Sequence, residues 1–403
     1  MAQGNHERPR VAMDCRGLGW GGLERHIKGL AHHLPLEAPE FEFVWVCTED
    51  QMHEIPLNGG SSHLVVRSPL VSVLEQIELP LALIRNKIDL FHALEMNSIP
   101  MVAPRLVVTC HDLTQLRYRE VMWKKIERAY YRLMINVSIR RAPKLIACSD
   151  FVRDDMLVEW PWAGDKVHTI LEAAADHFGP IEDAERLRDV KERYQLPDSF
   201  MFYLGSRKPH KNLPRLLEAY ALLPEETRRE NALVLIASPD PRWPQADEVI
   251  RRTGIEDDVI LLTGKRSARA PGGDGQAAYY SGEGGAVPDA DVEVLYALAK
   301  FMVIPSYTEG FGLPLVESMA IGTPVLAGRA GAMPEVGLDA VHYVDPLDVD
   351  DIRRGLQEMI DSPELLAELS AKGLARAADF SWAKTARNTA EIYRQALAAL
   401  GRS

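Results

Sequence analysis

Two glutamates in the C-terminal half of the chain are placed where they could bind a polar ligand. Glu309 and Glu317 lie in the stretch YTEGFGLPLVESMAIGTPVL, which follows the apolar run FMVIPS. The apolar run predicts a buried strand, and Pro314 with the apolar residues up to Gly322 predicts a helix. We expect Glu317 in the first turn of that helix. The alternative is that Glu317 only complements the helix N-terminus and that Glu309 is a solvated turn residue.

The turn between the two glutamates has the chemistry of an anion-binding loop. Gly310 and Gly312 let backbone N–H groups approach a ligand closely, and the positive end of the following helix favours a diphosphate. A carboxylate can accept hydrogen bonds from two neighbouring hydroxyl groups. Together these features predict a nucleotide-sugar site in which Glu317 holds the ribose and Glu309 holds the sugar.

The composition is that of a globular protein with two domains. A chain of 403 residues with 46% hydrophobic and 26% charged side chains can form a core in each half. The net charge of −12 excludes a general nucleic-acid-binding surface, although it permits a local basic patch. The four cysteines lack metal-ligand spacing, so we expect free buried thiols in a reducing compartment. The start has no signal-peptide character, and no run reaches about 18 apolar residues, which predicts a cytoplasmic protein.

Short apolar strands alternate with amphipathic helices along the whole chain, which predicts parallel sheets covered by helices on both faces. The pattern starts afresh at SFMFYLGSRKPHKNLPRLLEAYALL. We therefore predict an α/β protein with two Rossmann-like, doubly wound domains facing a cleft, with ligands at the carboxyl ends of the strands. The predicted parts are residues 1–180, residues 181–380 and a C-terminal helix at 381–403, for which a return to the first domain is one option.

Residues 267–290 depart from the alternation of strands and helices. The segment is rich in Gly, Ala and Pro and has neither a helical nor a strand period. We expect a loop, either passive or acting as a lid over a site.

Residues 305–336 resemble the E-x7-E signature of the retaining glycosyltransferases of family 4, whose architecture is the two-domain GT-B fold. Four further pieces agree with that family in chain order: GGLERHIKGLAHHL, LVVTCHDLTQLRY, KLIACSDFVRDDM and YLGSRKPHKNLPRLLEAY. The resemblance covers about residues 11–400. The layout from His111 to Asp150 is similar to bacterial mannosyl- and rhamnosyltransferases of polysaccharide assembly.

The resemblance implies a role for three catalytic residues. Glu309 would contact the hydroxyl groups of the donor sugar, and Lys211 would neutralise the diphosphate leaving group as its negative charge grows. His111 would lie near the reacting sugar, where its imidazole or its carbonyl group stabilises developing positive charge. The alternative for His111 is a histidine that caps the end of a strand.

The resemblance also implies the contacts of a nucleotide-diphosphate sugar. Relatives often carry an arginine directly after the glycine that matches Gly205, but Ser206 stands here, so Arg207 or Lys208 would supply the second phosphate contact. The implied donor-binding residues are Gly22, Gly205, Ser206, Arg207, Lys211, Glu309, Gly310, Phe311, Gly312, Leu313 and Glu317. Such contacts are common to all such donors, so the base, the sugar, the acceptor hydroxyl compound, the linkage and the oligomeric state stay open.

Family members retain the anomeric configuration by front-face attack, in which the leaving phosphate assists deprotonation of the acceptor. No carboxylate nucleophile and no separate general base are then required. GT-B enzymes usually need no metal, so the resemblance implies none, and the two Asp-x-Asp strings, at 289–291 and 348–350, lie in loop-like or helix-start contexts. We also expect no cofactor beyond the nucleotide-sugar co-substrate.

A competing motif lies near the N-terminus. Residues 17–22, GLGWGG, satisfy G-x-G-x-x-G between a strand and a helix, which by itself predicts a dinucleotide-binding oxidoreductase. The acids that end the next strand, Glu49 and Asp50, lie later than the usual spacing of about 20 residues. In a GT-B protein the same loop would approach the donor phosphates through Gly22.

The segment Arg117–Lys144 reverses the sign of the protein's charge, with nine cations against two acids and interleaved aromatic residues. It could contact an anionic membrane face, which would place the protein at the inner face of the cell membrane, or a phosphorylated acceptor. The alternative is a solvated helical face that pairs with acids elsewhere.

Three functions stay in view. A retaining, metal-independent glycosyltransferase of polysaccharide or glycoside biosynthesis, which uses a nucleotide-diphosphate sugar, comes first. The others are a non-catalytic protein that binds sugar nucleotides and another GT-B enzyme, an epimerase or a phosphorylase. Retention of Glu309, Glu317 and Lys211 together argues against the non-catalytic protein.

Overall fold

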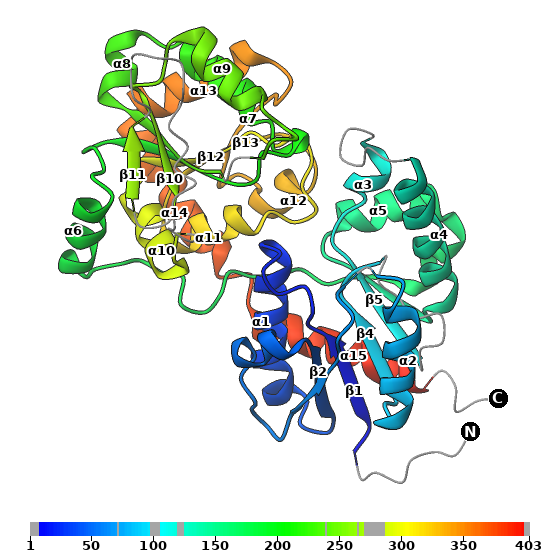
Figure 1. Cartoon of the computed structure of the whole chain (residues 1–403). Helices are drawn as coiled ribbons and strands as arrows, with labels where there is room; N and C mark the ends of the chain where they lie inside the picture. The colour runs from blue at the N-terminus through cyan, green and yellow to red at the C-terminus, as the bar shows by residue number, and fades with distance from the viewer. Residues whose placement is uncertain are drawn as a thin grey trace. The chain divides into compact units, whose positions relative to one another are not determined.

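The computed structural model describes residues 8–70, 72–96, 105–118, 125–237, 240–263, 266–269 and 287–398. The chain divides into two compact units. The N-terminal unit comprises residues 1–175 and 380–403, and the C-terminal unit comprises residues 176–379. Each unit contains one seven-stranded sheet covered by helices, which can be followed by colour in Figure 1.

The sheet of the N-terminal unit is parallel throughout, in the order β3-β2-β1-β4-β5-β6-β7. This is the strand order of a dinucleotide-type Rossmann fold, with its switch point between β1 and β4. The central strand β4 is buried along its whole length and β1 is buried beyond its first residue, as expected where helices cover both faces. The strands are β1 (Arg10–Asp14), β2 (Glu42–Cys47), β3 (Ser62–Val65), β4 (Leu90–Ala93), β5 (Arg105–Cys110), β6 (Lys144–Ala147) and β7 (Val167–Thr169).

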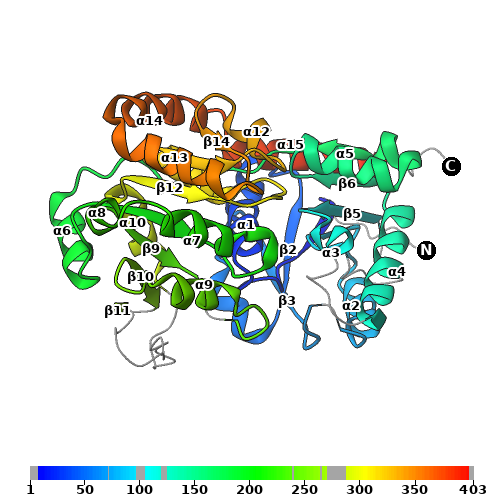
Figure 2. The same cartoon turned by 90° about the horizontal axis from the view of Figure 1, so that it is seen from above.

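Helices cover both faces of this sheet. Figures 1 and 2 place α2 and α15 on opposite faces, although α15 comes from the end of the chain. Helix α15 packs closely on α1, where a Cβ at Gly29 would lie 2.2 Å from the ring of Trp382. The helices are α1 (Gly22–Glu37), η1 (Glu49–Glu54), α2 (Glu75–Arg85), α3 (Thr114–Arg117), α4 (Lys125–Arg141), α5 (Asp150–Glu159), η3 (Pro161–Lys166) and α15 (Trp382–Ala398).

The sheet of the C-terminal unit has the order β11-β10-β9-β8-β12-β13-β14, again with a switch point, which lies between β8 and β12. All its pairs are parallel except β10 with β11. The strands are β8 (Phe200–Leu204), β9 (Ala232–Ile236), β10 (Val259–Thr263), β11 (Arg266–Arg269), β12 (Phe301–Ile304), β13 (Val325–Gly328) and β14 (His342–Val344).

Figure 1 shows α7, α9 and α13 on one side of this sheet and α10, α11 and α14 on the other. Apolar side chains of α7, α9 and α13 pack on the sheet and form a continuous core with its strands. The helices are α6 (Ala184–Arg193), η4 (Pro209–Lys211), α7 (Leu213–Ala221), α8 (Glu225–Glu230), α9 (Gln245–Thr253), α10 (Asp289–Leu298), α11 (Leu313–Ile321), α12 (Met333–Gly337), α13 (Val349–Asp361) and α14 (Pro363–Ala377). Two Rossmann-like units are therefore confirmed.

The predicted loop at 267–290 was wrong at both ends. Its first residues belong to β11, which pairs antiparallel with β10, and α10 begins at Asp289. Three or four residues of edge strand carry too little pattern to be recognised from sequence. Residues 270–286 lie outside the described residues. The expected free thiols are confirmed, since all four cysteines are buried and unpaired with one another.

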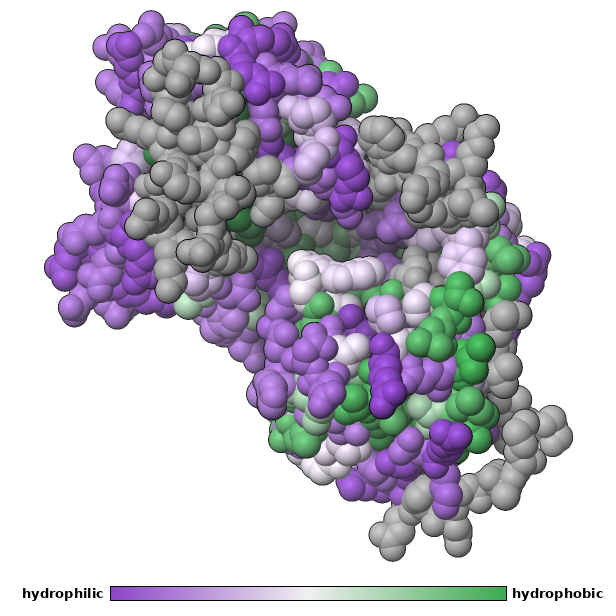
Figure 3. Space-filling model, viewed as in Figure 1, coloured by the Kyte–Doolittle hydropathy of each residue, from purple (hydrophilic) through white to green (hydrophobic). Residues whose placement is uncertain are grey.

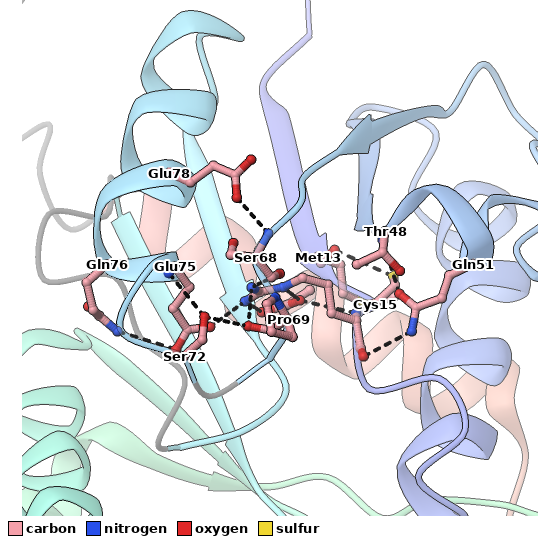
Figure 4. Close-up of polar contacts among 12 residues, drawn as sticks. Met13, Cys15, Thr48, Gln51, Ser68, Pro69, Ser72, Glu75, Gln76 and Glu78 are labelled. Atoms are coloured by element: carbon pink, nitrogen blue, oxygen red, sulfur yellow. Dashed lines mark hydrogen bonds and ion pairs between the residues drawn. The ribbon is translucent and has the colours of Figure 1, made fainter.

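A buried arginine fixes the loops at the carboxyl end of β1. Arg16 donates from Nε and Nη2 to the carboxylate of Asp14, at 2.8 and 2.6 Å, and forms an ion pair with Glu75 at 3.0 Å. It also donates to the carbonyl oxygen atoms of Ser68 and Pro69, which converge with Glu75 in Figure 4. A buried cation is tolerated because two carboxylates and two carbonyl groups compensate it, and this joins β1, the loop after β3 and the start of α2.

Candidate active site

In the C-terminal unit, two predicted residues meet beside the switch point of the sheet. Lys211 ends the short helix η4 after β8, and Glu309 lies in the turn after the neighbouring strand β12. The Lys211 Nζ atom lies 2.7 and 2.8 Å from the two carboxylate oxygen atoms of Glu309. Ser306 donates a further hydrogen bond of 2.6 Å to Oε1. The carboxyl ends of adjacent parallel strands thus bring together groups 98 positions apart in the chain.

The surroundings of Glu309 keep it ionised. Burial opposes ionisation, but the charge of Lys211, the nearby His210 and hydrogen bonds from Lys211 and Ser306 together lower the pKa of Glu309 below its usual value. The two paired side chains stay partly accessible, with 23% of Lys211 and 12% of Glu309 exposed. An accessible ammonium group beside an accessible carboxylate can serve a ligand that carries both hydroxyl groups and negative charge.

The backbone around Glu309 is held from two directions. The N–H group of Ala332 donates to the carbonyl oxygen of Glu309 at 3.0 Å, and Tyr307 donates to the carbonyl oxygen of His210 at 3.1 Å. Gly331 has φ +60°, and a Cβ there would lie 2.5 Å from the Glu309 nitrogen atom. Only glycine fits this position without strain, so the loop after β13 fixes the turn that carries Glu309.

The predicted helix after the turn is confirmed as α11, with Pro314 in its first turn and Gly322 at its C-terminal end, in a left-handed conformation. The placement of Glu317 in the first turn was wrong. Glu317 is the fifth residue of α11, because the helix begins at Leu313, and its side chain is completely buried. The hydroxyl group of Tyr296 donates to its Oε2 atom at 3.0 Å. Glu317 therefore does not complement the N-terminus of α11, and its role toward a ribose stays a prediction.

The loop after β8 distinguishes the two cations that could replace the missing arginine. The side chain of Arg207 is 1% exposed, donates to Asp247 at 2.7 Å and donates to the carbonyl oxygen of Ala237 at 3.2 Å. Lys208 and Ser206 are exposed. The guanidinium group of Arg207 is thus engaged in joining this loop to α9, whereas the side chain of Lys208 is exposed. The second phosphate contact stays a prediction.

Gly205 is confined by its neighbours in the same loop. A Cβ at Gly205 would lie 2.9 Å from the hydroxyl oxygen of Tyr203, which donates to the carbonyl oxygen of Ser206 at 3.0 Å. Burial raises the pKa of Tyr203, so its hydroxyl group stays a donor. The glycine is therefore required by a close contact within the unit, whatever its role toward a donor.

In the N-terminal unit, His111 shares a carboxylate with a second histidine. His111 follows β5, Glu172 lies beyond the end of β7, and His26 lies on α1. The Oε1 atom of Glu172 lies 2.8 Å from Nδ1 of His26 and 3.0 Å from Nδ1 of His111. The two imidazole rings meet edge to face, with centroids 4.7 Å apart. Both Nδ1 atoms are therefore committed to Glu172 as donors.

The electrostatics of this cluster separate the two histidines. Glu172 is desolvated by burial, but His26 and His111 lower its pKa to about 2. For His26, burial outweighs the attraction of Glu172 and lowers the pKa. For His111, burial is outweighed by the hydrogen bond and charge of Glu172, helped by Glu95 and Asp112, and the pKa is raised. Near neutral pH the proton therefore favours His111, and Glu172 stays ionised.

Both Nε2 atoms of the cluster are buried and have no hydrogen-bond partner among the described residues. The ring of His111 is nevertheless 22% exposed, whereas that of His26 is 5% exposed and packs edge to face on Trp382. His111 is therefore the member of the pair that a ligand could meet. Its assigned role near the reacting sugar stays a prediction.

The cluster also has the composition of a metal site. One ligand atom each from His26, His111 and Glu172 lie within 4.8 Å of one another. The separations between Oε1 and the two Nδ1 atoms are those of ordinary N–H···O hydrogen bonds, so protons account for the contacts of both Nδ1 atoms with Glu172.

The glycine loop at 17–22 leads into α1, whose first residue is Gly22. Gly19 and Gly21 have positive φ angles of 85° and 56°, which explains why glycine recurs here. Between them the side chain of Trp20 is 53% exposed, so the loop presents an aromatic surface beside the carboxyl end of β1. Sequence reasoning considered only the glycines of this loop.

The basic segment is partly neutralised within its own unit. Arg117 forms hydrogen-bonded ion pairs with Asp155 and Glu159 of α5, and Arg132 pairs with Glu159 at 2.7 Å. The alternative of a helical face that pairs with acids elsewhere therefore holds for these two arginines. Residues 119–124 lie outside the described residues.

Four residues of these sites went unnoticed in the sequence: Glu172, His26, Ser306 and Gly331. Glu172 follows a short strand, and a carboxylate at that place is a signal that could have been found. Ser306 and Gly331 lie in the stretch that carries the E-x7-E signature, but neither residue is part of the signature itself. His26 could not be assigned, because its partner is 146 positions away.

Family models match both units of the chain. Residues 20–172 match the model described as Glycosyltransferase Family 4, and residues 284–376 match the model described as Glycosyl transferases group 1. The chain is 33% identical over 297 residues to O-antigen chain mannosyltransferase B of Escherichia coli. The matched residues cover 73% of this chain and 72% of that protein. It is also 31% identical to the MMP alpha-(1->4)-mannosyltransferase of Mycolicibacterium hassiacum, over 73% of this chain and 66% of that protein.

A longer relative also matches part of its length, and solved structures share the fold of this chain. The serotype-specific mannosyltransferase WbdA of Escherichia coli is 31% identical over 73% of this chain, which spans only 34% of that protein. Sucrose-phosphate synthase from Thermosynechococcus elongatus has the same fold, with a TM-score of 0.72 at 19% identity over 97% of this chain and 100% of that chain. So has Anabaena HepE in complex with UDP-glucose, with a TM-score of 0.72 at 16% identity over 96% of this chain and 99% of that chain.

The two parallel-sheet units define a protein of the GT-B class. The chain belongs to glycosyltransferase family 4. It is a glycosyltransferase, a different class from the oxidoreductase that the G-x-G-x-x-G motif predicts by itself.

Proposed function

We propose that the protein is a retaining, metal-independent glycosyltransferase that moves a sugar from a nucleotide-diphosphate sugar to an acceptor hydroxyl group. The observation that carries the proposal is the pair formed by Lys211 and Glu309 at the switch point of the C-terminal sheet. In open α/β sheets this is the place where ligands bind. The pair offers one acceptor group for sugar hydroxyls and one cation for a diphosphate.

The pair also suggests how charge is handled during transfer. Without a donor, Lys211 neutralises Glu309. With a donor, Glu309 would accept hydrogen bonds from the sugar, and Lys211 would lie between that carboxylate and the diphosphate. As the glycosidic bond breaks, negative charge grows on the leaving phosphate, and a fixed cation stabilises that charge more than it stabilises the ground state. The leaving phosphate would take the proton of the acceptor hydroxyl group, so retention requires no carboxylate nucleophile.

Other predicted residues complete the donor site in this proposal. The backbone N–H groups from Gly310 to Leu313 precede and open α11, where the helix dipole favours the diphosphate. Glu317 would hold the ribose, and Lys208 would supply the second phosphate contact. In the N-terminal unit, His111 and the loop at Gly22 would act on the reacting sugar and the phosphates.

We propose mannose as the transferred sugar. The proposal rests on relatives named as mannosyltransferases, two of them at 31 to 33% identity over 73% of this chain. The sugar hydroxyls would be the groups that Glu309 contacts. For the acceptor, the basic character of the Arg117–Lys144 segment would suit the phosphate groups of a lipid-linked or phosphorylated glycan.

A donor panel tests the proposal. The full chain is incubated with the mannose and glucose derivatives of GDP, UDP, ADP and TDP, and the shift of its thermal midpoint is recorded, since a ligand stabilises the folded state according to its affinity. The stabilising donor is then used for transfer to acceptor glycans in the presence of EDTA, and the anomeric proton of the product is observed by NMR. We expect retained configuration and activity that survives EDTA.

Two results would overturn the proposal. Lys211→Met should abolish most of the turnover, whereas Lys191→Met, at an exposed ion pair with Asp198 in the same unit, should leave it unchanged. Equal turnover of the two variants would remove the role of Lys211. Donor binding without any transfer would instead indicate a protein that only binds sugar nucleotides.

A further inference from the structure

Helix α2 is apolar on both of its faces. Its inner face packs on the N-terminal unit through the buried side chains of Leu79, Pro80 and Leu83. Its outer face is apolar as well. The exposed apolar residues of this face and of the turn before it are Val73 (77% exposed), Leu74 (54%), Ile77 (63%), Leu81 (47%) and Ile84 (61%).

These side chains form one continuous surface. Ile77, Leu81 and Ile84 are spaced by four and three positions, which puts them on one side of a helix. Figure 3 shows hydrophobic side chains gathered over α2. Single exposed apolar residues are normal on protein surfaces, but a contiguous stripe indicates a surface that is covered in use. We call the five residues Val73, Leu74, Ile77, Leu81 and Ile84 the α2 stripe.

The charges around the α2 stripe are cationic, although the protein as a whole carries −12. Arg67, Arg85 and Lys87 are exposed. The two acids of the helix are turned to other partners. Glu75 is completely buried against Arg16, and Glu78 accepts hydrogen bonds from the backbone N–H groups of Arg67 and Ser68.

We propose that the α2 stripe is a docking surface for an anionic lipid bilayer, with α2 lying in the plane of the interface. An apolar helix face flanked by exposed cations fits such an interface, because the side chains enter the boundary between headgroups and acyl chains while Arg and Lys meet the phosphates. None of the described helices is long and apolar enough to span a membrane, so α2 would lie on it. A second copy of this chain fits less well, since symmetric docking would bring Arg85 and Lys87 near their own counterparts.

Vesicle sedimentation with the full chain tests this surface without any knowledge of donor or acceptor. Sucrose-loaded vesicles of phosphatidylglycerol and phosphatidylcholine in equal parts are compared with vesicles of phosphatidylcholine alone. We expect the protein to sediment with the anionic vesicles, and salt to weaken the binding. The variant Ile77→Ser/Leu81→Ser/Ile84→Ser should lower the partition coefficient at least about tenfold, because it removes the buried apolar contacts.

The control replaces equally exposed apolar side chains that do not adjoin one another. Val158, Leu222 and Leu347 are 72%, 57% and 62% exposed, and their joint replacement by serine should leave the binding unchanged. A third variant, Arg85→Gln/Lys87→Gln, should weaken binding to the anionic vesicles alone. Far-UV circular dichroism checks that each variant is folded.

Three outcomes would overturn the proposal: a native chain that sediments with neither vesicle, a serine variant of the α2 stripe that binds as well as the native chain, and native dimers in sedimentation velocity that this variant converts to monomers. The last outcome would assign the surface to a second copy. All these readouts are independent of sugar transfer, so their failure leaves the proposed function in place.

Discussion

The two units each hold a carboxylate beyond the carboxyl end of a parallel strand, partly accessible in the C-terminal unit and buried in the N-terminal unit, and they compensate it differently. In the C-terminal unit, Glu309 is met by one ammonium group and one hydroxyl group, from Lys211 and Ser306. In the N-terminal unit, Glu172 is shared by the imidazole groups of His26 and His111. An ammonium group keeps its charge at neutral pH, whereas an imidazole gains or loses a proton there. The comparison places a constant charge in one unit and a pH-dependent charge in the other.

The largest effect is expected from breaking the pair of Lys211 and Glu309. Glu309→Gln and Lys211→Met should each lower the turnover by about 10² to 10³, because each removes a group that acts on the charge of the transition state. The double variant should be little worse than the poorer single variant, since the two groups act as a unit. Initial rates with a fixed donor measure this.

These two single variants and the double variant form a double-mutant cycle. Its matched control replaces Lys191 and the exposed Glu364 of the same unit. Their variants, Lys191→Met and Glu364→Gln, should behave as the native protein, alone and together. Additive losses in the cycle of Glu309 and Lys211 would mean that the pair seen in the structure does not work as one group.

The second prediction breaks the pH-dependent pair. Glu172→Gln keeps the shape of the side chain but removes the charge that raises the pKa of His111, so the NMR titration midpoint of His111 should fall. If His111 acts on the reacting sugar, the turnover should fall about tenfold, a change within the range for acid–base groups, and its pH dependence should move to lower pH. An unchanged titration midpoint of His111 would show that the charge of Glu172 does not raise the pKa of His111. The variant Glu159→Gln, at a surface ion pair of the same unit, is the control.

Glu172 should also contribute to stability at mildly acidic pH. Its folded pKa of about 2 lies below the ordinary value of 4.5, so the unfolded chain binds more protons between these values. The stabilisation is fully present above pH 4.5 and is lost as the pH falls toward 2. The difference in free energy of unfolding between native protein and Glu172→Gln should therefore shrink with acid, which urea titrations from pH 6 to 3 measure. A constant difference would contradict the depressed pKa.

A further prediction tests whether the backbone at Gly331 holds Glu309 in place. Gly331→Ala introduces a Cβ that meets the backbone of Glu309 and also strains a φ angle of +60°, whereas Gly254→Ala, at φ +68°, meets nothing within 4 Å. We expect Gly254→Ala to cost about 1 kcal/mol of unfolding free energy and Gly331→Ala clearly more, with loss of turnover only in the latter. Equal losses in urea titrations would show that the loop after β13 does not hold Glu309.

The smallest expected effect concerns the cations of the loop after β8. Lys208→Gln should raise the KM for the donor about three- to tenfold with little change in kcat, because an exposed lysine contributes a modest share of phosphate binding. Arg207→Gln should instead lower the thermal midpoint, since it leaves Asp247 without its buried partner. If instead Arg207→Gln raised the KM for the donor and Lys208→Gln left it unchanged, Arg207 would be the phosphate ligand.

Several features were set by local sequence. The alternation of short apolar runs with amphipathic segments predicted both sheets, because parallel strands covered on both faces must be apolar throughout. Pro314 and Gly322 predicted the ends of α11 correctly, because each has a backbone preference that does not depend on distant residues. The positions of Glu309 and Lys211 in turns after strands followed from the same pattern, whereas the adjacency of those two strands is a finding of the structure.

Only the tertiary structure decided which groups meet. Glu172 lies 146 positions from His26 and 61 from His111, and no local pattern records that β5, β7 and α1 bring them within hydrogen-bond distance. The same holds for Arg207, whose charge was visible but whose engagement by Asp247 was not. In α2, which of the apolar side chains face the sheet and which stay exposed likewise depends on packing. Sequence fixes the chemistry and local conformation of each residue, whereas burial and pairing arise only when distant segments pack together.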